Sequence, residues 1–346
     1  MNDSPEPLDA DTPDDAWGEA TTRLFYDLTP DTILDAVEQT GLRCTGRCLA
    51  LNSLENRVFE IEIEPDAPVA SVSDRFVVAK FYRPGRWSRT QILDEHAFLA
   101  EAAAADLPVV APLDLGGDTL GETDEGILFT LFPRRAGRTI DEVTPALAER
   151  LGALVARLHA VGRQGEAPHR LHLTPETYGL HALDDLLERR AIPPHLENEL
   201  IDLVEGICET SAPWFDDAPV QRLHGDMHLG NLLLHPDEGL RVVDFDDMVN
   251  GPPVQDLWLL AADPDAHDVR DALLRGYRTF GTFDMAQWRL VEPLRALRYI
   301  HFAAWIARRW TDPAFPDAFP NFGTDRYWDE LLADLREQWR RINALR

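Results

Sequence analysis

The stretch QRLHGDMHLGNLLLHPDEGLRVVDFDD, residues Gln221–Asp247, decides how the fold of this chain is interpreted. A polar loop precedes a run of three leucines, the turn HPDEG follows, and a β-rich run ends at Asp244. Short apolar runs joined by a tight turn predict a hairpin. This hairpin would bring four polar residues together at one end, namely His224, Asp226, Asn231 and Asp244.

Three of these residues, Asp226, Asn231 and Asp244, carry the carboxylate and amide oxygens that suit Mg²⁺. With a nucleotide present, such a set performs phosphoryl transfer. Asp226 would orient the acceptor hydroxyl, and Asn231 and Asp244 would hold the metal, so that Asp226 and Asp244 are the predicted catalytic residues. The alternative is an ordinary hairpin with solvated acids in its loops. The order of five residue types around two strands favours the first interpretation.

The same motif carries a family resemblance. His224-Gly-Asp226-x-His-x-x-Asn231, followed by Val-Val-Asp244-Phe-Asp246, resembles the Brenner-type motif of the protein-kinase-like phosphotransferases, the superfamily of aminoglycoside and choline kinases. The D-x-x-x-x-N spacing is also similar to the catalytic loop of protein kinases. The resemblance is specific for the type of reaction and says little about the substrate.

Length and composition agree with an enzyme of two lobes around a cleft, because 346 residues with 45% hydrophobic content can bury a sizeable core. The net charge of −28 argues against non-specific binding to nucleic acid or to an anionic membrane. It fits either a basic substrate or a solvated acidic surface. No apolar run approaches about 18 residues and no signal peptide is evident, so a cytoplasmic monomer with three free cysteines is expected.

The N-terminal part predicts a small antiparallel sheet. Residues 1–27 are acidic and expected to be disordered. A helix is predicted from Thr29 and Pro30 to Gly41, and strands follow on both sides of the polar turn Asn52–Arg57. This turn lacks glycine, so Asn52 and Ser53 would instead offer side-chain and backbone donors to phosphate oxygens, and a plain hairpin is the alternative. The predicted N-lobe covers residues 28–133.

Lys80 lies on the third predicted strand of this sheet and is the only lysine of the chain. Its retention where every other basic side chain is Arg or His indicates a need for a compact ammonium, as in a kinase lysine that contacts α- and β-phosphates. On the helix predicted over 88–105, Glu95 lies at the margin of the apolar face. Glu95 is therefore the predicted partner of Lys80.

The remaining chain, residues 134–346, predicts a larger helical C-lobe. The apolar run that ends at Pro133 would be the hinge that contacts adenine. Asp256 lies near the start of a helix, where it either braces the catalytic loop, as in the superfamily, or simply caps the helix. The predicted fold class is α+β, a two-lobed protein-kinase-like fold. The other helices are predicted over 143–161, 180–190, 194–209, 267–280, 285–310 and 325–343.

A narrower resemblance covers residues 28–345. The chain is similar to the bacterial stress response kinase A family, which implies a Ser/Thr protein kinase, ATP and Mg²⁺, and a cytoplasmic role in stress survival. The resemblance assigns Ser53 to the nucleotide, Asp226 to the proton, and Asn231 and Asp244 to magnesium. It rests on Leu51-Asn-Ser53-x-Glu55-Asn-Arg-Val, Phe76-Val-Val-x-Lys80-Phe-Tyr, Gln91-Ile-Leu-x-Glu95-His, Asn250-Gly-Pro-x-Val-Gln-Asp256-Leu-Trp258, and Leu294-Arg-Ala-Leu-Arg-Tyr-Ile-His with the Trp and Arg residues after it.

One departure bears on the substrate. Asp244-Phe-Asp246 replaces the glycine-ended triplet of eukaryotic-type protein kinases, and only eleven residues separate Asp244 from Asp256. No long activation loop fits there, and the usual platform for a peptide substrate is missing. A protein substrate with a Ser/Thr acceptor, the chain itself included, is the first hypothesis, and a small-molecule kinase acting on a hydroxyl or amino compound is the alternative. A catalytically silent binding module is the third, and the complete residue set argues against it.

Overall fold

The computed structural model describes Phe25 and residues 28–69, 71–263 and 265–346. These residues pack as two compact units. Unit 1 runs to His96 and continues over Ala111–Arg135, while unit 2 consists of Ala97–Val110 and Ala136–Arg346. The fold is α+β, as predicted. Apart from Phe25, the predicted acidic extension over 1–27 lies outside the described residues.

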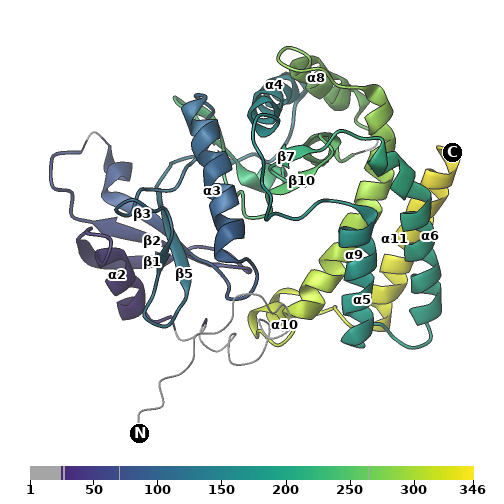
Figure 1. The fold of residues 1–346 in the computed structure, drawn as a ribbon, viewed down its shortest axis with the longest axis horizontal. Helices are drawn as coiled ribbons and strands as arrows, with labels where there is room; N and C mark the ends of the chain where they lie inside the picture. Colours follow the sequence, from purple (N-terminus) through teal and green to yellow (C-terminus); the bar gives the residue numbers. More distant parts are fainter. Residues whose placement is uncertain (1–24, 26–27, 70, 264) are drawn as a thin grey trace, which may run out of the picture. The chain divides into compact units, whose positions relative to one another are not determined.

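Unit 1 is built on an antiparallel sheet with the strand order β1-β2-β3-β5-β4 (Figure 1). Helix α2 begins as predicted, because Thr29 Oγ1 accepts the Thr32 N–H at 3.2 Å and Pro30 occupies the first turn. Its apolar face belongs to one core with the sheet. The elements are α2 (Pro30–Glu38), β1 (Cys44–Ala50), β2 (Arg57–Ile63), β3 (Phe76–Phe81), β4 (Gly121–Glu122), β5 (Leu128–Pro133) and α3 (Arg89–Ala104), of which Arg89–His96 belongs to unit 1.

Unit 2 is mainly helical. Its predicted helices are present as α4 (Pro145–Gly162), α5 (His181–Glu188), α6 (Glu197–Asp216), α8 (His267–Tyr277), α9 (Val291–Arg308) and α11 (Asp325–Ala344), joined by the short α7 (Val254–Trp258) and α10 (Ala314–Ala318). Helix α6 extends past the predicted end at residue 209 and contains Pro213. The strands are β6 (Arg138–Thr139), β7 (Gln221–Leu223), β8 (Leu232–His235), β9 (Gly239–Val242) and β10 (Val249–Gly251).

The predicted hairpin is present as β8 and β9, which pair antiparallel around the turn. The residues that precede the polar loop do not join it. Strand β7 pairs instead with β10, with Arg222 opposite Asn250. The polar loop therefore connects two separate small sheets, and β10 lies just before the helix that carries Asp256.

The segment Ala97–Val110 belongs to unit 2 although it follows unit 1 in sequence. Phe98 makes an edge-to-face contact with Phe245, with ring centroids 5.8 Å apart, and Glu101 pairs with Arg222 at 2.5 Å. Val109 forms a β-bridge with Val242. The continuous lobe predicted over 28–133 differs from unit 1 in this segment, because the contacts of the segment are made with residues distant in the sequence.

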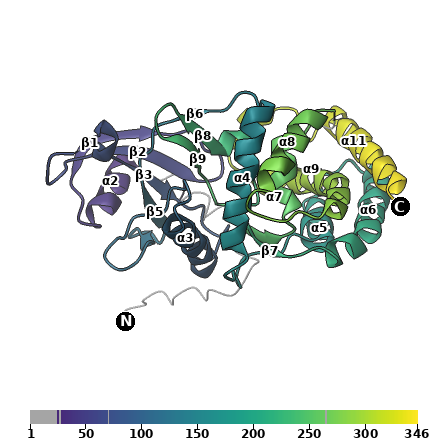
Figure 2. The ribbon, with the colours of Figure 1, turned by 90° about the horizontal axis from the view of Figure 1, so that it is seen from above.

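Helices α4 and α8 pack side by side within unit 2 (Figure 2). Two glycines permit this contact. A Cβ atom on Gly152 would lie 1.9 Å from the Leu273 carbonyl oxygen, and one on Gly276 would lie 1.8 Å from that of Glu149. The close approach brings His159 of α4 to Tyr277 of α8, whose hydroxyl lies 3.0 Å from His159 Nδ1. No helix among the described residues has the length and apolar character needed to cross a membrane.

Candidate active site

The catalytic loop of unit 2 runs from His224 to Asn231, between β7 and β8. Gly225 has a φ of +86°, and a Cβ atom there would lie 2.0 Å from the Asp247 carbonyl oxygen. Any other residue would be strained and would displace the segment after Asp244. The glycine of the motif is therefore a requirement of the backbone.

Asp256 braces this loop. Its two carboxylate oxygens accept hydrogen bonds from consecutive backbone groups, the N–H of His224 at 3.0 Å and that of Gly225 at 2.9 Å. His159 Nε2 lies 3.0 Å from one of the same oxygens, and both side chains are fully buried. Of the two roles considered for Asp256, the brace is confirmed.

A second set of hydrogen bonds ties the loop to its neighbours. Gln255 Nε2 donates to the Gly225 carbonyl oxygen at 2.7 Å. His224 Nε2 lies 3.0 Å from the Val243 carbonyl oxygen, which can only accept, so this nitrogen carries the proton. His224 Nδ1 is then free to accept the Asp226 N–H at 3.2 Å. These bonds hold the backbone of Asp226 and the approach to Asp244 in one arrangement.

The Asp226 side chain contacts Arg298 and His228. Arg298 Nη1 of α9 donates to Oδ1 at 2.8 Å, and His228 Nε2 lies 3.2 Å from Oδ2. Burial opposes ionisation, but the hydrogen bond from His228 and the charges of Arg298 and His228 outweigh it and hold the pKa of Asp226 well below its usual range. The hydrogen bond to Asp226 in turn raises the pKa of His228. Asp226 is thus a carboxylate at neutral pH.

Asn231 and Asp244 fit a metal held jointly with phosphates. Asn231 Nδ2 donates to the Asp226 carbonyl oxygen at 2.9 Å, which leaves the amide oxygen Oδ1 as the atom available to a cation. Asp244 is exposed and adopts a left-handed φ of +61° directly after β9. The described residues contain no group of three or more His, Cys, Asp or Glu side chains that could hold a metal. Mg²⁺ commonly binds one or two carboxylates and substrate phosphates, so a complete protein cage is not required.

Asp246 differs from Asp244 in burial, since its residue is only 3% exposed. The buried Arg170 donates to the backbone oxygen of Asp246 and, through Nε at 2.7 Å, to that of Met248. The segment after Asp244 is thereby fixed through its main chain. Of the two acids in the Asp-Phe-Asp run, Asp244 is the one open to a ligand.

In unit 1, the predicted pairing of Lys80 with Glu95 is present. Lys80 Nζ lies 3.9 Å from Glu95 Oε1, and the two side chains are 8% and 1% exposed. Lys80 Nζ also lies 4.9 Å from the centre of the Tyr82 ring. On β3, Lys80 is opposite Val58 of β2 and Thr130 of β5, so the ammonium projects from the middle of the sheet.

Ser53 lies in the loop between β1 and β2 and is half-buried. Arg83 holds the following part of this loop, because its side chain donates to the carbonyl oxygens of Leu54 at 3.1 Å and Glu55 at 3.0 Å. The Arg83 N–H donates to Asn56 Oδ1 at 3.2 Å. The loop without glycine is thus fixed by a buried arginine. The assignment of Ser53 to the nucleotide stays a prediction.

A family model described as the phosphotransferase enzyme family matches residues 50–294. The chain belongs to this family. Stress response kinase A of Escherichia coli strain K12 is 38% identical over 317 residues, which is 91% of this chain and 93% of the relative. A Salmonella typhimurium relative described as serine/threonine protein kinase RdoA is 35% identical over the same shares of both chains. The chain is therefore also a member of the stress response kinase A family.

Solved structures of other kinases share the fold at lower sequence identity. Amicoumacin kinase hAmiN, in complex with AMP-PNP, Ca²⁺ and Ami, has a TM-score of 0.71 and 18% identity, covering 93% of this chain and 96% of its own. A microcompartment-associated aminopropanol kinase has a TM-score of 0.59 and 17% identity, covering 88% and 94%. These likenesses establish the kinase-like phosphotransferase fold.

Several residues that support the site were not predicted from the sequence. Each acts through a contact with a residue far away in the chain, and each looks locally like an ordinary core or surface residue. His159 lies within a helical pattern that does not distinguish it from a core residue. Gln255 precedes Asp256 and belongs to no motif that assigns it a role. The residues missed in this way are Arg83, His159, Arg170, Gln255 and Arg298.

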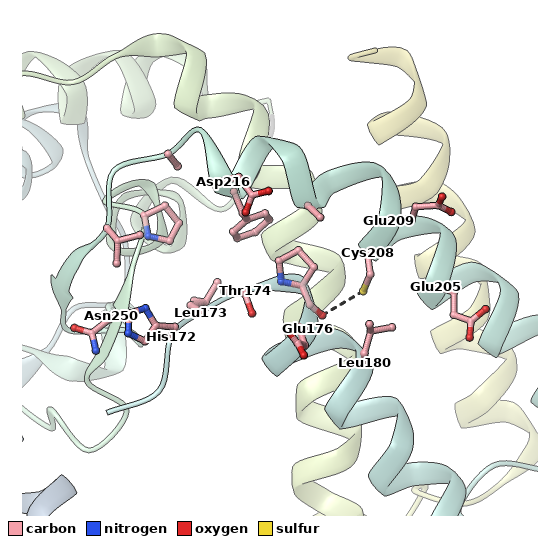
Figure 3. A pocket seen from close by; sticks show the side chains of 16 residues that line it. His172, Leu173, Thr174, Glu176, Leu180, Glu205, Cys208, Glu209, Asp216 and Asn250 are labelled. Carbon is pink, nitrogen blue, oxygen red and sulfur yellow. Dashed lines mark hydrogen bonds between the residues drawn. The ribbon is translucent and has the colours of Figure 1, made fainter. Parts of the chain in front are cut away.

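Unit 2 of this phosphotransferase also contains a cavity of about 710 Å³, whose lining side chains are drawn in Figure 3. Its wall includes Thr174, Cys208 of α6 and Asn250 of β10. Cys208 Sγ donates to the Pro175 carbonyl oxygen at 3.3 Å across one side of it. The predicted catalytic and metal-binding residues Asp226, Asn231 and Asp244 are not among the residues that line it.

Proposed function

We propose that this phosphotransferase is an ATP- and Mg²⁺-dependent serine/threonine protein kinase of the cytoplasm that acts as a monomer. The observation that supports this best is the fixed Asp226 carboxylate, whose backbone is held by His224 and whose loop is braced by Asp256. The names of the relatives support Ser/Thr as the acceptor. The substrate is a protein whose Ser or Thr hydroxyl accepts the phosphate, and the chain itself is one candidate.

In the proposed reaction, the acceptor hydroxyl oxygen forms a bond to the γ-phosphorus of ATP. The bond between that phosphorus and the β,γ-bridging oxygen breaks, and ADP leaves with the electron pair. The hydroxyl proton passes to the Asp226 carboxylate. Asn231 and Asp244 would hold Mg²⁺, which would neutralise phosphate charge during the transfer. Lys80, held by Glu95, is proposed to contact the α- and β-phosphates, and Ser53 the nucleotide.

The assignment of metal ligands has its own test. Asp244→Asn is expected to weaken Mg²⁺-dependent nucleotide binding far more than Asp246→Asn or Asp247→Asn, because Asp244 is exposed beside the loop whereas Asp246 is buried. Mg²⁺ titration of nucleotide binding in the three variants measures this. Equal effects would show that a different acid holds the metal.

A small-molecule kinase is the second candidate, and one observation favours it. The eleven residues between Asp244 and Asp256 form a short segment that is held by contacts with neighbouring elements. Strand β10 pairs with β7, and Asn250 Nδ2 donates to the Ala167 carbonyl oxygen at 2.8 Å. This segment offers no long loop on which a peptide could lie, so a hydroxyl or amino compound is the alternative acceptor.

Transfer of label from ATP distinguishes the two. Wild-type protein with Mg-ATP is incubated with a protein panel at two salt concentrations, with Asp226→Asn as the blank, and then with a metabolite panel. A protein kinase is expected to label itself or a generic basic protein on Ser or Thr. Because the chain carries a net charge of −28, labelling of a basic protein should weaken as salt rises. No labelled protein above the blank, together with turnover of a small acceptor, would replace the first proposal by the second.

A further inference from the structure

Arg298 of α9 lies beside the proposed catalytic carboxylate, and most of its guanidinium donors are not used in contacts within the described part of the protein. Its Nη1 donates to Asp226 Oδ1 at 2.8 Å, while its side chain remains 41% exposed. Among the residues that the structure describes, Asp226 is the one hydrogen-bonding partner of this guanidinium. A guanidinium has five N–H donors, so most of them face solvent directly next to Asp226.

Other arginines of unit 2 show what a structural role looks like. Arg170 is buried and donates to the backbone oxygens of Asp246 and Met248. Arg222 is 1% exposed and donates to the Gly162 and Val161 oxygens as well as to Glu101. The donors of these two guanidinium groups form hydrogen bonds with oxygens of the protein. Arg298 instead holds one carboxylate oxygen and presents the rest of its planar fork outward.

The acceptor must come to the same place. Any hydroxyl that gives its proton to Asp226 lies within hydrogen-bonding distance of that carboxylate, and Arg298 already lies within this distance on the Oδ1 side. A carboxylate or phosphate carried beside the hydroxyl would meet the outward donors of the guanidinium. Planar bidentate recognition of such anions is the chemistry for which arginine is suited.

We propose that Arg298 selects the phosphate acceptor by binding an anionic group carried next to the acceptor hydroxyl, and that it thereby sets the hydroxyl against Asp226. This rests on the proposed kinase function and names its acceptor as a Ser or Thr with a neighbouring carboxylate side chain. The transfer balances as described above, with the hydroxyl oxygen bonded to the γ-phosphorus, ADP released and the proton on Asp226. The acidic surface of the whole protein would attract basic proteins over a long range. Arg298 would act only on an anionic group that is in direct contact with it.

The test compares three variants on matched substrates. Arg298→Gln removes the charge and Arg298→Lys keeps it without the planar fork. Arg308→Gln is the control, because Arg308 lies on the same helix and pairs with Asp185 away from the catalytic loop. Each protein is given two serine peptides that differ only in an Asp or an Asn beside the serine. ATP hydrolysis without an acceptor is measured in parallel.

Wild type and Arg308→Gln are expected to prefer the Asp peptide by about tenfold or more in kcat/KM, as one charge-assisted hydrogen-bonded contact would give. Arg298→Gln should reduce this ratio to about one through a higher KM for the Asp peptide. Arg298→Lys should restore part of it. The ratio between the two peptides is the deciding measurement, because a merely structural pair with Asp226 would lower activity on both peptides equally.

Two outcomes would overturn the inference. One is an equal loss on both peptides in Arg298→Gln that leaves their ratio unchanged, and the other is no preference for the acidic substrate in wild type. If wild type phosphorylates no peptide, the same variants are assayed with glycerate and its neutral counterpart glycerol. A preference for glycerate that disappears in Arg298→Gln would support the role of Arg298 while refuting a protein acceptor.

Discussion

Asp256 in unit 2 and Asp118 in unit 1 use the same local chemistry with different consequences. Each accepts hydrogen bonds from two consecutive backbone N–H groups, those of His224 and Gly225 for Asp256 and those of Thr119 and Leu120 for Asp118. Asp256 is fully buried, whereas the Asp118 side chain is 45% exposed. Water can replace Asp118 but cannot reach the groups that Asp256 satisfies. Burial therefore decides which of the two carboxylates matters for the fold.

The partners of the two carboxylates differ in the same way. Asp256 continues inward to His159 and from there to the Tyr277 hydroxyl, so two helices support the catalytic loop. Asp118 pairs with Arg89 at 2.6 Å, and that arginine is 44% exposed. A buried chain of hydrogen bonds therefore fixes the loop relative to α4 and α8. The surface pair supports only the turn in which Asp118 lies. The predictions below separate chemistry, positioning and surface support.

The largest effect is expected for Asp226, the proposed general base, whose side chain does not brace the loop. Asp226→Asn should lower phosphoryl transfer at least about a hundredfold, the usual scale for general-base positioning. Its thermal stability should stay close to wild type, because the backbone ties of the loop remain. Turnover and the melting temperature are measured on the same preparation. Full activity in purified Asp226→Asn would refute the assignment of the base.

Lys80→Arg tests whether unit 1 contributes by position or only by charge. The variant keeps the positive charge near Glu95, but its larger planar head should misplace the phosphates. A loss of up to about a hundredfold in kcat/KM is expected, the scale for a misplacement of about 1 Å. Stability should remain near normal. Wild-type kinetics would mean that the only lysine of the chain was retained by chance.

Asp256→Asn should lower stability and activity together, in contrast to Asp226→Asn. An amide presents a donor where one backbone N–H needs an acceptor, so a buried polar group is left unsatisfied. We expect a loss of about 3 kcal/mol in the free energy of unfolding and of about tenfold in turnover. Urea unfolding followed by fluorescence measures the first. Unchanged stability would show that water reaches this site, and the contrast with Asp118 would fail.

Asp118→Asn should have the smallest effect, below about 1 kcal/mol, as for exposed ion pairs. Burial opposes ionisation of Asp118, but the hydrogen bonds from Leu120 and Thr119 and the Arg89 charge outweigh it, so its pKa is lowered. A lowered folded pKa stabilises the fold above the unfolded value of 3.8, and this is lost as pH falls through the folded pKa. The stability difference between wild type and variant should hold from pH 7 to 5 and shrink below about pH 4. A difference that grows on acidification would contradict this sign.

The sequence by itself determined the phosphotransferase family and the order of most elements, and it predicted which polar residues the structure brings together at the catalytic loop. Residues close together in the chain carried that information: the D-x-x-x-x-N spacing, the turn between β8 and β9, and the Thr29-Pro30 helix start. The pairing of Lys80 with Glu95 was also predicted, because the lone lysine marks one strand and Glu95 lies on the helix that follows it, although Ala100 and Ala103 of the predicted apolar face are exposed. Periodicity reports the face of an element and needs no knowledge of its partner.

Only the tertiary structure decided how the loop from His224 to Asn231 is held and which side chains contact Asp226. The pairing of β7 with β10, the support of Asp256 by His159, and the contact of Arg298 with Asp226 join residues 28, 97 and 72 positions apart. Such contacts depend on the close approach of helices such as α4 and α8, which no local pattern encodes. A buried arginine, histidine or aspartate satisfies its hydrogen bonds wherever the folded chain offers a partner, so its role becomes visible only once the distant segments have met.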